Sequence, residues 1–187
     1  MANQIGEFTS KREKRLWVWI FFVWVTISAS LFVGRPFAHQ LRSQDVQAIF
    51  FLMAMILAAV AVCVHGIRTK PSKWEFTLLI GLATIYLMLF FRLGAPERSH
   101  LIEYSVLAIF LHMALLERAK HRRLPLSPVL LSWLMASFLG ILDESIQYVI
   151  PNRVFDPEDI VFNVMAVSMA LGSSLLLRWG RRRWENR

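Results

Sequence analysis

Long apolar runs alternate with short polar stretches along most of the chain, and the runs have the length of membrane-spanning helices. Leu16–Gly34 contains no charged residue in 19 positions, and Val46–Ile67 contains none in 22. A helix needs about 20 residues to cross the hydrocarbon core of a bilayer. The other predicted spans are Phe76–Phe91 with Trp74 and Leu93 as extensions, Ser99–Leu116, Pro128–Ile150 and Pro157–Trp179. The pattern therefore predicts an all-α integral membrane bundle of about six transmembrane helices.

Capping residues mark the ends of two of these spans. Ser72 followed by Glu75 has the S-x-x-E spacing of a capping box, and Gly94 is suited to the C-terminal cap of the same helix. Ser127 precedes Pro128, which places a capping hydroxyl before proline at the first helical position. We expect helices to begin at both places.

The basic residues predict the orientation of the bundle. If the N-terminus is cytoplasmic and the helices alternate, 16 of the 21 Lys and Arg residues lie on the inside. This distribution satisfies the positive-inside rule and places the C-terminus in the cytoplasm too. The five basic residues left outside are Arg35, Arg42, Arg92, Arg98 and Arg153. We predict one membrane domain over 1–187, with three N-terminal helices in 1–95, a three-helix core in 96–177 and a basic cytoplasmic tail in 178–187.

Composition agrees with a membrane protein. The chain is 56% hydrophobic and 18% charged, whereas soluble domains average about 25% charged residues. The net charge of +8 follows the ends of apolar runs, so we assign it to topology and to anionic membrane lipids, and we exclude nucleic acid as a partner. The single cysteine, Cys63, allows no intrachain disulfide. A cleaved signal peptide is the alternative interpretation of the first span, but its apolar run is longer than a usual signal core.

Polar residues gather at matching ends of the last three predicted spans. In the alternating topology these ends all lie at the outer face, and the spacings of three and four residues put each group on one helical face. Such residues must face the bundle interior or a wet cavity, because lipid would leave them unsatisfied. The candidate ligand-binding residues are His100, Glu103, Tyr104, Asp143, Glu144, Gln147, Arg153, Asp159 and Asn163.

Some of these polar residues have structural explanations. Asp156 can cap the helix that begins at Pro157, and Glu158 can complement its dipole, so we assign both to the helix start. Tyr104 could be an interfacial aromatic residue, Arg153 could neutralise nearby acids, and Asn163 could bridge helices. Structural explanations fit His100, Glu103, Asp143 and Glu144 less well.

The polar positions resemble the VanZ-like family of small bacterial membrane proteins. The matching residues are His100-Leu-Ile-Glu103-Tyr104 and Glu144-x-x-Gln147-x-x-x-Pro151-x-Arg153-x-x-Asp156-x-x-Asp159-x-x-x-Asn163. The resemblance covers about Pro96 to Leu177. Ala166 stands where the family commonly has glycine, and Asp143 stands where an apolar or small residue is expected. The resemblance implies a cell-envelope role in the bacterial cytoplasmic membrane and a family link to resistance against the glycopeptide teicoplanin. It implies no reaction.

Three functions are compatible with these observations. The first is binding or modulation of an envelope lipid or peptidoglycan-related ligand, with arginines such as Arg92, Arg98 and Arg153 contacting phosphate. The second is an accessory subunit of a larger membrane complex. The third is a membrane hydrolase or transferase acting on an envelope lipid, in which His100 or Glu103 acts as base and carboxylates hold a cation. We rank enzyme below binding because the sequence has no nucleophile motif and no zinc spacing. It assigns no metal, pigment or other cofactor.

Overall fold

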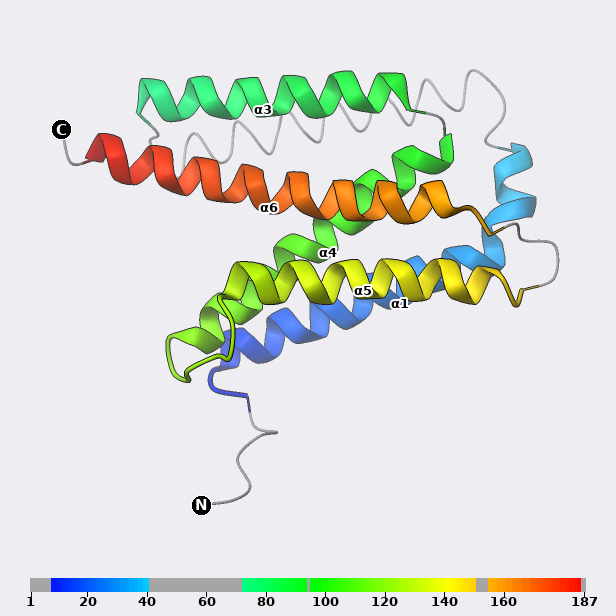
Figure 1. The fold of residues 1–187 in the computed structure, drawn as a ribbon, viewed down its shortest axis with the longest axis horizontal. Helices are drawn as coiled ribbons and strands as arrows, with labels where there is room; N and C mark the ends of the chain where they lie inside the picture. Colours follow the sequence, from blue (N-terminus) through cyan, green and yellow to red (C-terminus); the bar gives the residue numbers. More distant parts are fainter. Residues whose placement is uncertain (1–7, 41–71, 94, 151–154, 186–187) are drawn as a thin grey trace, which may run out of the picture. The chain divides into compact units, whose positions relative to one another are not determined.

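The computed structural model describes residues 8–40, 72–93, 95–150 and 155–185, and every regular element in these ranges is an α-helix (Figure 1). The helices are α1 Lys11–Gln40, α3 Lys73–Arg92, α4 Ala95–Ala119, α5 Pro128–Gln147 and α6 Pro157–Glu185. The predicted span Val46–Ile67 and the predicted cap Gly94 lie outside the described residues. The prediction of an all-helical protein is confirmed for the part of the chain that is described.

Four of these helices are long and apolar enough to cross a membrane. They are Lys73–Arg92, Ser99–Ala119, Pro128–Gln147 and Pro157–Arg183. Helix α1 also contains the charge-free run Leu16–Gly34 that the sequence marks as the first span. The helix ends differ from the predicted apolar spans, and α1, α3 and α4 each extend beyond theirs at both ends. Helix α5 ends at Gln147 rather than at the predicted Ile150, because a residue that precedes proline, here Pro151, is biased against helical backbone angles. Helix α6 continues past the predicted Trp179 to Glu185, because basic residues are favourable at the C-terminal end of a helix.

The two predicted caps at helix starts are present. The Ser72 hydroxyl accepts a hydrogen bond from the Glu75 amide at 3.2 Å and begins α3. The Ser127 hydroxyl accepts from the Leu130 amide at 3.3 Å, with Pro128 in the first turn of α5. Each cap satisfies one of the amides that the first turn of a helix leaves without an intrahelical partner.

Helix α5 has the inverse of the usual amphipathic pattern. Its buried residues are all small or polar: Ser132, Ala136, Ser137, Gly140, Asp143, Glu144 and Gln147. Its exposed positions carry large apolar side chains, including Leu130, Leu134, Phe138, Ile141, Leu142 and Ile146. Hydrocarbon favours this arrangement, because lipid solvates the apolar face and small residues let helices approach closely. The pattern supports a membrane location for the protein.

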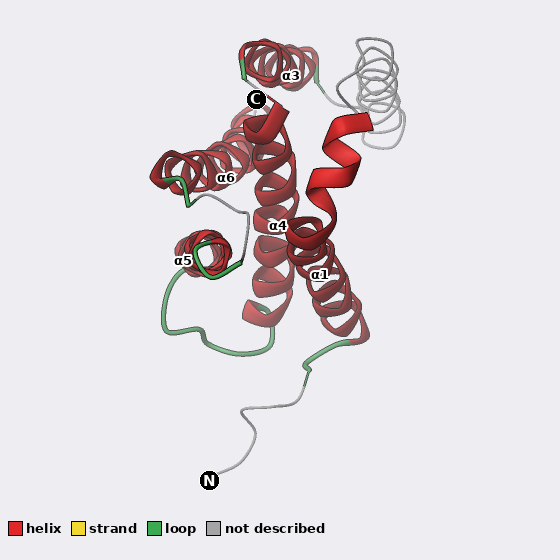
Figure 2. Ribbon diagram, turned by 90° about the vertical axis from the view of Figure 1, so that its right-hand side faces the viewer, coloured by secondary structure: helices red, strands yellow, loops and turns green. Residues whose placement is uncertain are grey.

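The chain forms two compact units, Met1–Ala29 with Gly94–Gly172, and Ser30–Leu93 with Ser173–Arg187. In the first unit α4 lies between α5 and α1, as Figure 2 shows. The rings of Trp19 in α1 and Phe110 in α4 stack with centroids 6.5 Å apart. The Trp133 indole donates to the Ser168 hydroxyl at 2.9 Å and so joins α5 to α6. Fully buried Leu107 and Leu111 of α4 form the centre of this unit.

In the second unit a buried acid joins α3 to the C-terminal part of α6. Glu75 is nearly buried, and its Oε1 accepts hydrogen bonds from Arg181 Nη2 at 2.6 Å and Arg181 Nε at 3.1 Å. Two of the three guanidinium nitrogen atoms therefore contact the same carboxylate oxygen. The acid that the sequence presents as part of a capping box thus also forms an ion pair between helices.

Candidate functional site

Three ionisable side chains from three helices meet in the first unit. His100 near the start of α4, Glu144 near the end of α5 and Asp159 near the start of α6 each bring one ligand atom within 4.8 Å of the other two. His100 Nε2 lies 3.7 Å from Asp159 Oδ2. The predicted convergence of these helix ends is therefore present among the described residues. We call the surrounding group the three-helix site, and it consists of His100, Glu103, Tyr104, Asp143, Glu144, Gln147, Asp159 and Asn163.

Glu144 is the most enclosed acid of the three-helix site, with 0% of its surface exposed. Its Oε1 accepts a hydrogen bond from Gln147 Nε2 at 2.5 Å, one helical turn along α5. Its Oε2 is buried and has no hydrogen-bond partner among the described residues. Asp143 and Asp159 lie near enough for their negative charges to repel that of Glu144. When Glu144 is ionised, its Oε2 therefore requires a further donor or a cation.

The aromatic and acidic residues of α4 border the same carboxylates. The His100 and Tyr104 rings stack with centroids 6.1 Å apart, and Tyr104 is buried. The Tyr104 hydroxyl hydrogen-bonds the carboxylate of Asp143, which is also buried. Glu103 is half-buried and near enough to Asp143 for charge repulsion. The structure therefore brings all three predicted α4 residues to the acids of α5.

Asn163 lies deeper in the bundle, where α5 and α6 approach closely at Gly140. The Asn163 side chain is 0% exposed, and its Nδ2 donates to the Gly140 carbonyl at 3.5 Å. Its Oδ1 is buried and has no partner in the described part of the chain. A Cβ at Gly140 would lie 2.9 Å from the Asn163 Cβ and 3.2 Å from the Tyr104 ring. Gly140 is thus a supporting residue that the sequence analysis missed, although the Ala136-x-x-x-Gly140 spacing was its signal.

The two acids assigned to the start of α6 lie at its surface. Asp156 Oδ1 accepts from the Glu158 amide at 2.9 Å, and its carbonyl accepts from the Asp159 amide at 3.1 Å. Asp156 therefore caps α6, as its sequence position predicts. Both Asp156 and Glu158 are exposed. Arg153, the remaining predicted site residue, lies outside the described residues.

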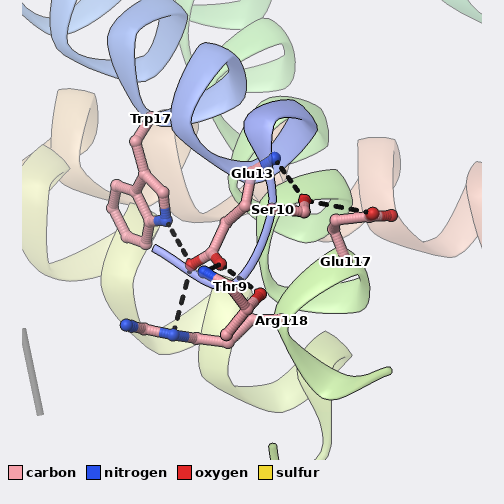
Figure 3. Close-up of polar contacts among 6 residues, drawn as sticks. All are labelled: Thr9, Ser10, Glu13, Trp17, Glu117 and Arg118. Carbon is pink, nitrogen blue, oxygen red and sulfur yellow. Dashed lines mark hydrogen bonds and ion pairs between the residues drawn. The ribbon is translucent and has the colours of Figure 1, made fainter. Parts of the chain in front are cut away.

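A second polar cluster joins the start of α1 to the C-terminal end of α4 (Figure 3). We call it the α1–α4 cluster, and it consists of Thr9, Ser10, Glu13, Trp17, Glu117 and Arg118. Glu13 is 0% exposed and accepts from the Thr9 amide at 2.7 Å, the Thr9 hydroxyl at 2.5 Å and the Trp17 indole at 3.3 Å. Arg118 Nε completes its surroundings at 3.2 Å.

The charge on Glu13 is stabilised by these partners. Burial raises the pKa of Glu13, but the hydrogen bonds from Thr9 and the Arg118 guanidinium outweigh it and hold the pKa below its ordinary value of 4.5. The α1–α4 cluster was not predicted from the sequence. Its signal was Ser10-x-x-Glu13, the spacing of a capping box, and the Glu13 amide does donate to the Ser10 hydroxyl at 3.0 Å.

No protein-family model, no curated protein and no solved structure matches the chain. The chemistry open to the three-helix site therefore follows from its own atoms. Imidazole and carboxylate groups can accept protons, accept hydrogen bonds or coordinate a cation. Because the unpartnered oxygen atoms of Glu144 and Asn163 are both acceptors, the site is suited to a ligand that brings donors or positive charge.

Proposed function

We propose that this chain is a multi-pass protein of the bacterial cytoplasmic membrane that binds or modulates an envelope lipid or a peptidoglycan-related ligand. In this proposal both termini are cytoplasmic, and the three-helix site faces the outer side of the membrane. The distribution of Lys and Arg supports the orientation. The resemblance of the site residues to the VanZ-like family supports the envelope role.

One observation carries the proposal: two buried acceptor oxygens at the three-helix site have no donor among the described residues. They are Glu144 Oε2 on α5 and Asn163 Oδ1 on α6. An unsatisfied buried polar group typically costs about 1–3 kcal/mol, and more when it is charged. Apolar side chains would fill a purely structural contact between helices without this cost. The arrangement is that of a binding site whose hydrogen bonds are completed by its ligand.

The acceptors also indicate the chemistry of the headgroup. Tyr104 and Gln147 direct their donors at acids of the site, and the two oxygen atoms left without a partner among the described residues, Glu144 Oε2 and Asn163 Oδ1, are acceptors. Hydroxyl and amino groups, as found on sugars and peptides, would satisfy them. A bare phosphate would be repelled by Glu144 and Asp159 unless a cation accompanied it. We therefore favour a ligand with a saccharide or amine-bearing headgroup over a simple anionic phospholipid.

Native mass spectrometry of the purified protein tests this function. The protein is incubated in micelles with a lipid-linked disaccharide-peptide, and separately with phosphatidylglycerol. We expect selective retention of the first lipid, and we expect Asp143→Asn and Glu144→Gln to weaken it by about tenfold or more, in line with about 1.5–3 kcal/mol for a charged hydrogen bond. Glu158→Gln is the matched control, because Glu158 is an exposed acid on the same turn of α6 as Asp159. Unchanged retention in both site variants would refute the assignment.

A further inference from the structure

The three-helix site contains a set of ligand atoms with the dimensions of a metal centre. One atom each from His100, Glu144 and Asp159 lies within 4.8 Å of the others. Ligands at about 2.0–2.2 Å from one metal ion lie about 3.3–4.4 Å from each other. The separation of 3.7 Å between His100 Nε2 and Asp159 Oδ2 is already in that range. The Glu144 ligand atom lies within 4.8 Å of both, close to the upper end of that range.

The hydrogen bonding around these residues independently points to a missing partner. Glu144 is 0% exposed, yet its Oε2 has no hydrogen-bond partner among the described residues. Gln147 holds the other oxygen at 2.5 Å and so fixes the orientation of the carboxylate. Metal-binding carboxylates are commonly oriented by such an outer hydrogen bond. His100 is 9% exposed and also keeps a buried nitrogen, Nδ1, without a partner in the described part of the chain.

Charge supports a cation rather than a further donor. Asp143, Asp156 and Asp159 all lie close enough to Glu144 to repel its negative charge. A group of carboxylates at the end of apolar helices is costly without neutralisation, and a divalent cation neutralises two of them at once. Removal of water around Glu144 strengthens that attraction.

We propose that His100, Glu144 and Asp159 bind a divalent transition-metal ion of the Zn²⁺ or Mn²⁺ type. One imidazole with two carboxylates suits these ions, whereas Mg²⁺ and Ca²⁺ prefer oxygen ligands alone. Three protein ligands leave a coordination position open, as in catalytic rather than structural zinc sites. This inference deepens the proposed function and rests on it for the identity of the ligand. The bound ion would attract a phosphate of the lipid to a site whose own groups are mainly acceptors.

Metal titration of the full-length protein in detergent tests the site with the metal alone. We expect one equivalent of Mn²⁺ per chain, displaced by Zn²⁺ but not by equimolar Mg²⁺ or Ca²⁺. Electron spin-echo spectra of bound Mn²⁺ should show coupling to a nitrogen atom of His100. This measurement on the unmodified protein does not depend on whether a variant folds.

Variants assign the ligands. His100→Ala and Asp159→Asn should each weaken Mn²⁺ binding by at least about tenfold, and Glu158→Gln should leave it unchanged. Absence of stoichiometric binding, absence of nitrogen coupling, or equal affinity in His100→Ala and Glu158→Gln would each overturn the metal site. Lipid retention after removal of metal by a chelator separates the two proposals. If retention persists while no metal site is found, the metal inference alone fails; if the metal binds and no lipid is retained, the proposed function alone fails.

Discussion

Removing the Glu13 carboxylate should destabilise the protein more than any surface ion pair at the same end of the first unit. Four donor groups converge on this side chain: the Thr9 amide, the Thr9 hydroxyl, the Trp17 indole and Arg118 Nε. Glu13→Ala leaves them without an acceptor. Removing one partner of a buried ion pair costs about 3–5 kcal/mol. The Arg118 side chain is 24% exposed and can regain water, so we expect a loss near the lower limit, about 3 kcal/mol.

Arg12→Gln provides the matched control. Arg12 is the neighbouring residue on α1, its side chain is 58% exposed, and its Nη1 lies 3.8 Å from Glu117 Oε2. An exposed pair of this kind contributes about 0–1 kcal/mol. Glu13→Gln should fall between the two, because its amide oxygen can still accept from Thr9 but carries no charge to attract Arg118.

Denaturant unfolding in detergent micelles, followed by tryptophan fluorescence, measures these free energies. Trp17 is itself a partner of Glu13, so part of the change in the summed emission of the seven tryptophans should come from loss of the α1–α4 cluster. A double-mutant cycle with Arg118→Ala isolates the interaction between the two charges. If the unfolding free energies of Glu13→Ala and Arg12→Gln differ by less than about 0.5 kcal/mol, the buried Glu13 ion pair does not stabilise the first unit and the reasoning is wrong.

Three further predictions concern other properties of the chain. The pKa of Glu13 in the folded protein is held below its ordinary value of 4.5. The ionised Glu13 side chain therefore contributes its full stabilisation of the fold above about pH 4.5, and this contribution is lost as the pH falls through the lower, folded-state pKa. Wild type should therefore lose more unfolding free energy than Glu13→Gln on acidification, and parallel pH profiles would contradict this. Gly140→Ala should lower the unfolding free energy by about 1–3 kcal/mol, because the added Cβ would meet Asn163. Gly172→Ala is the control and should be neutral or stabilising, because nothing lies within 4 Å of the added Cβ. Equal effects of the two substitutions would argue against close packing of α5 on α6. The proposed orientation places Phe155 on the outer side and His121 in the cytoplasm. In a Cys63→Ser background, a membrane-impermeant maleimide should therefore label Phe155→Cys in intact cells and His121→Cys only after lysis, and the reverse pattern would overturn the orientation.

The helices were predictable because lipid imposes a simple constraint on sequence. A spanning segment must satisfy its own backbone and must be apolar over about 20 residues, so helix positions follow from the apolar runs. Capping residues then located the starts of α3 and α5. The meeting of His100, Glu144 and Asp159 followed from alternation of the helices, since their ends must fall on one side. The ends of α5 and α6 were misjudged because helices can continue past the apolar run or stop before it.

The contacts that were missed depend on tertiary packing. Glu13 lies among Lys11, Arg12, Lys14 and Arg15, and such a run is usually a solvated flank of a membrane helix. The approach of Arg118 on α4, which has no signal in the local sequence, gives the buried Glu13 carboxylate its ion-pair partner. Gly140 was missed for a related reason, because a glycine in an apolar helix shows its role only when the neighbouring helix is known. Periodicity identifies the face of a helix but does not identify the residues it will meet.

The two polar clusters lie at opposite ends of α4, and their separation explains how one helix can serve both. His100 and Glu117 are about 17 residues apart, which corresponds to about 25 Å at 1.5 Å per residue. This is close to the hydrocarbon thickness of about 30 Å, so a membrane-spanning α4 would place the clusters near opposite surfaces. The α1–α4 cluster then stabilises the helix at one surface and leaves the other end available for the three-helix site. Glu13→Ala should therefore lower stability while Mn²⁺ affinity of the folded protein stays unchanged, and a tenfold loss of affinity would show that the two ends of α4 are coupled.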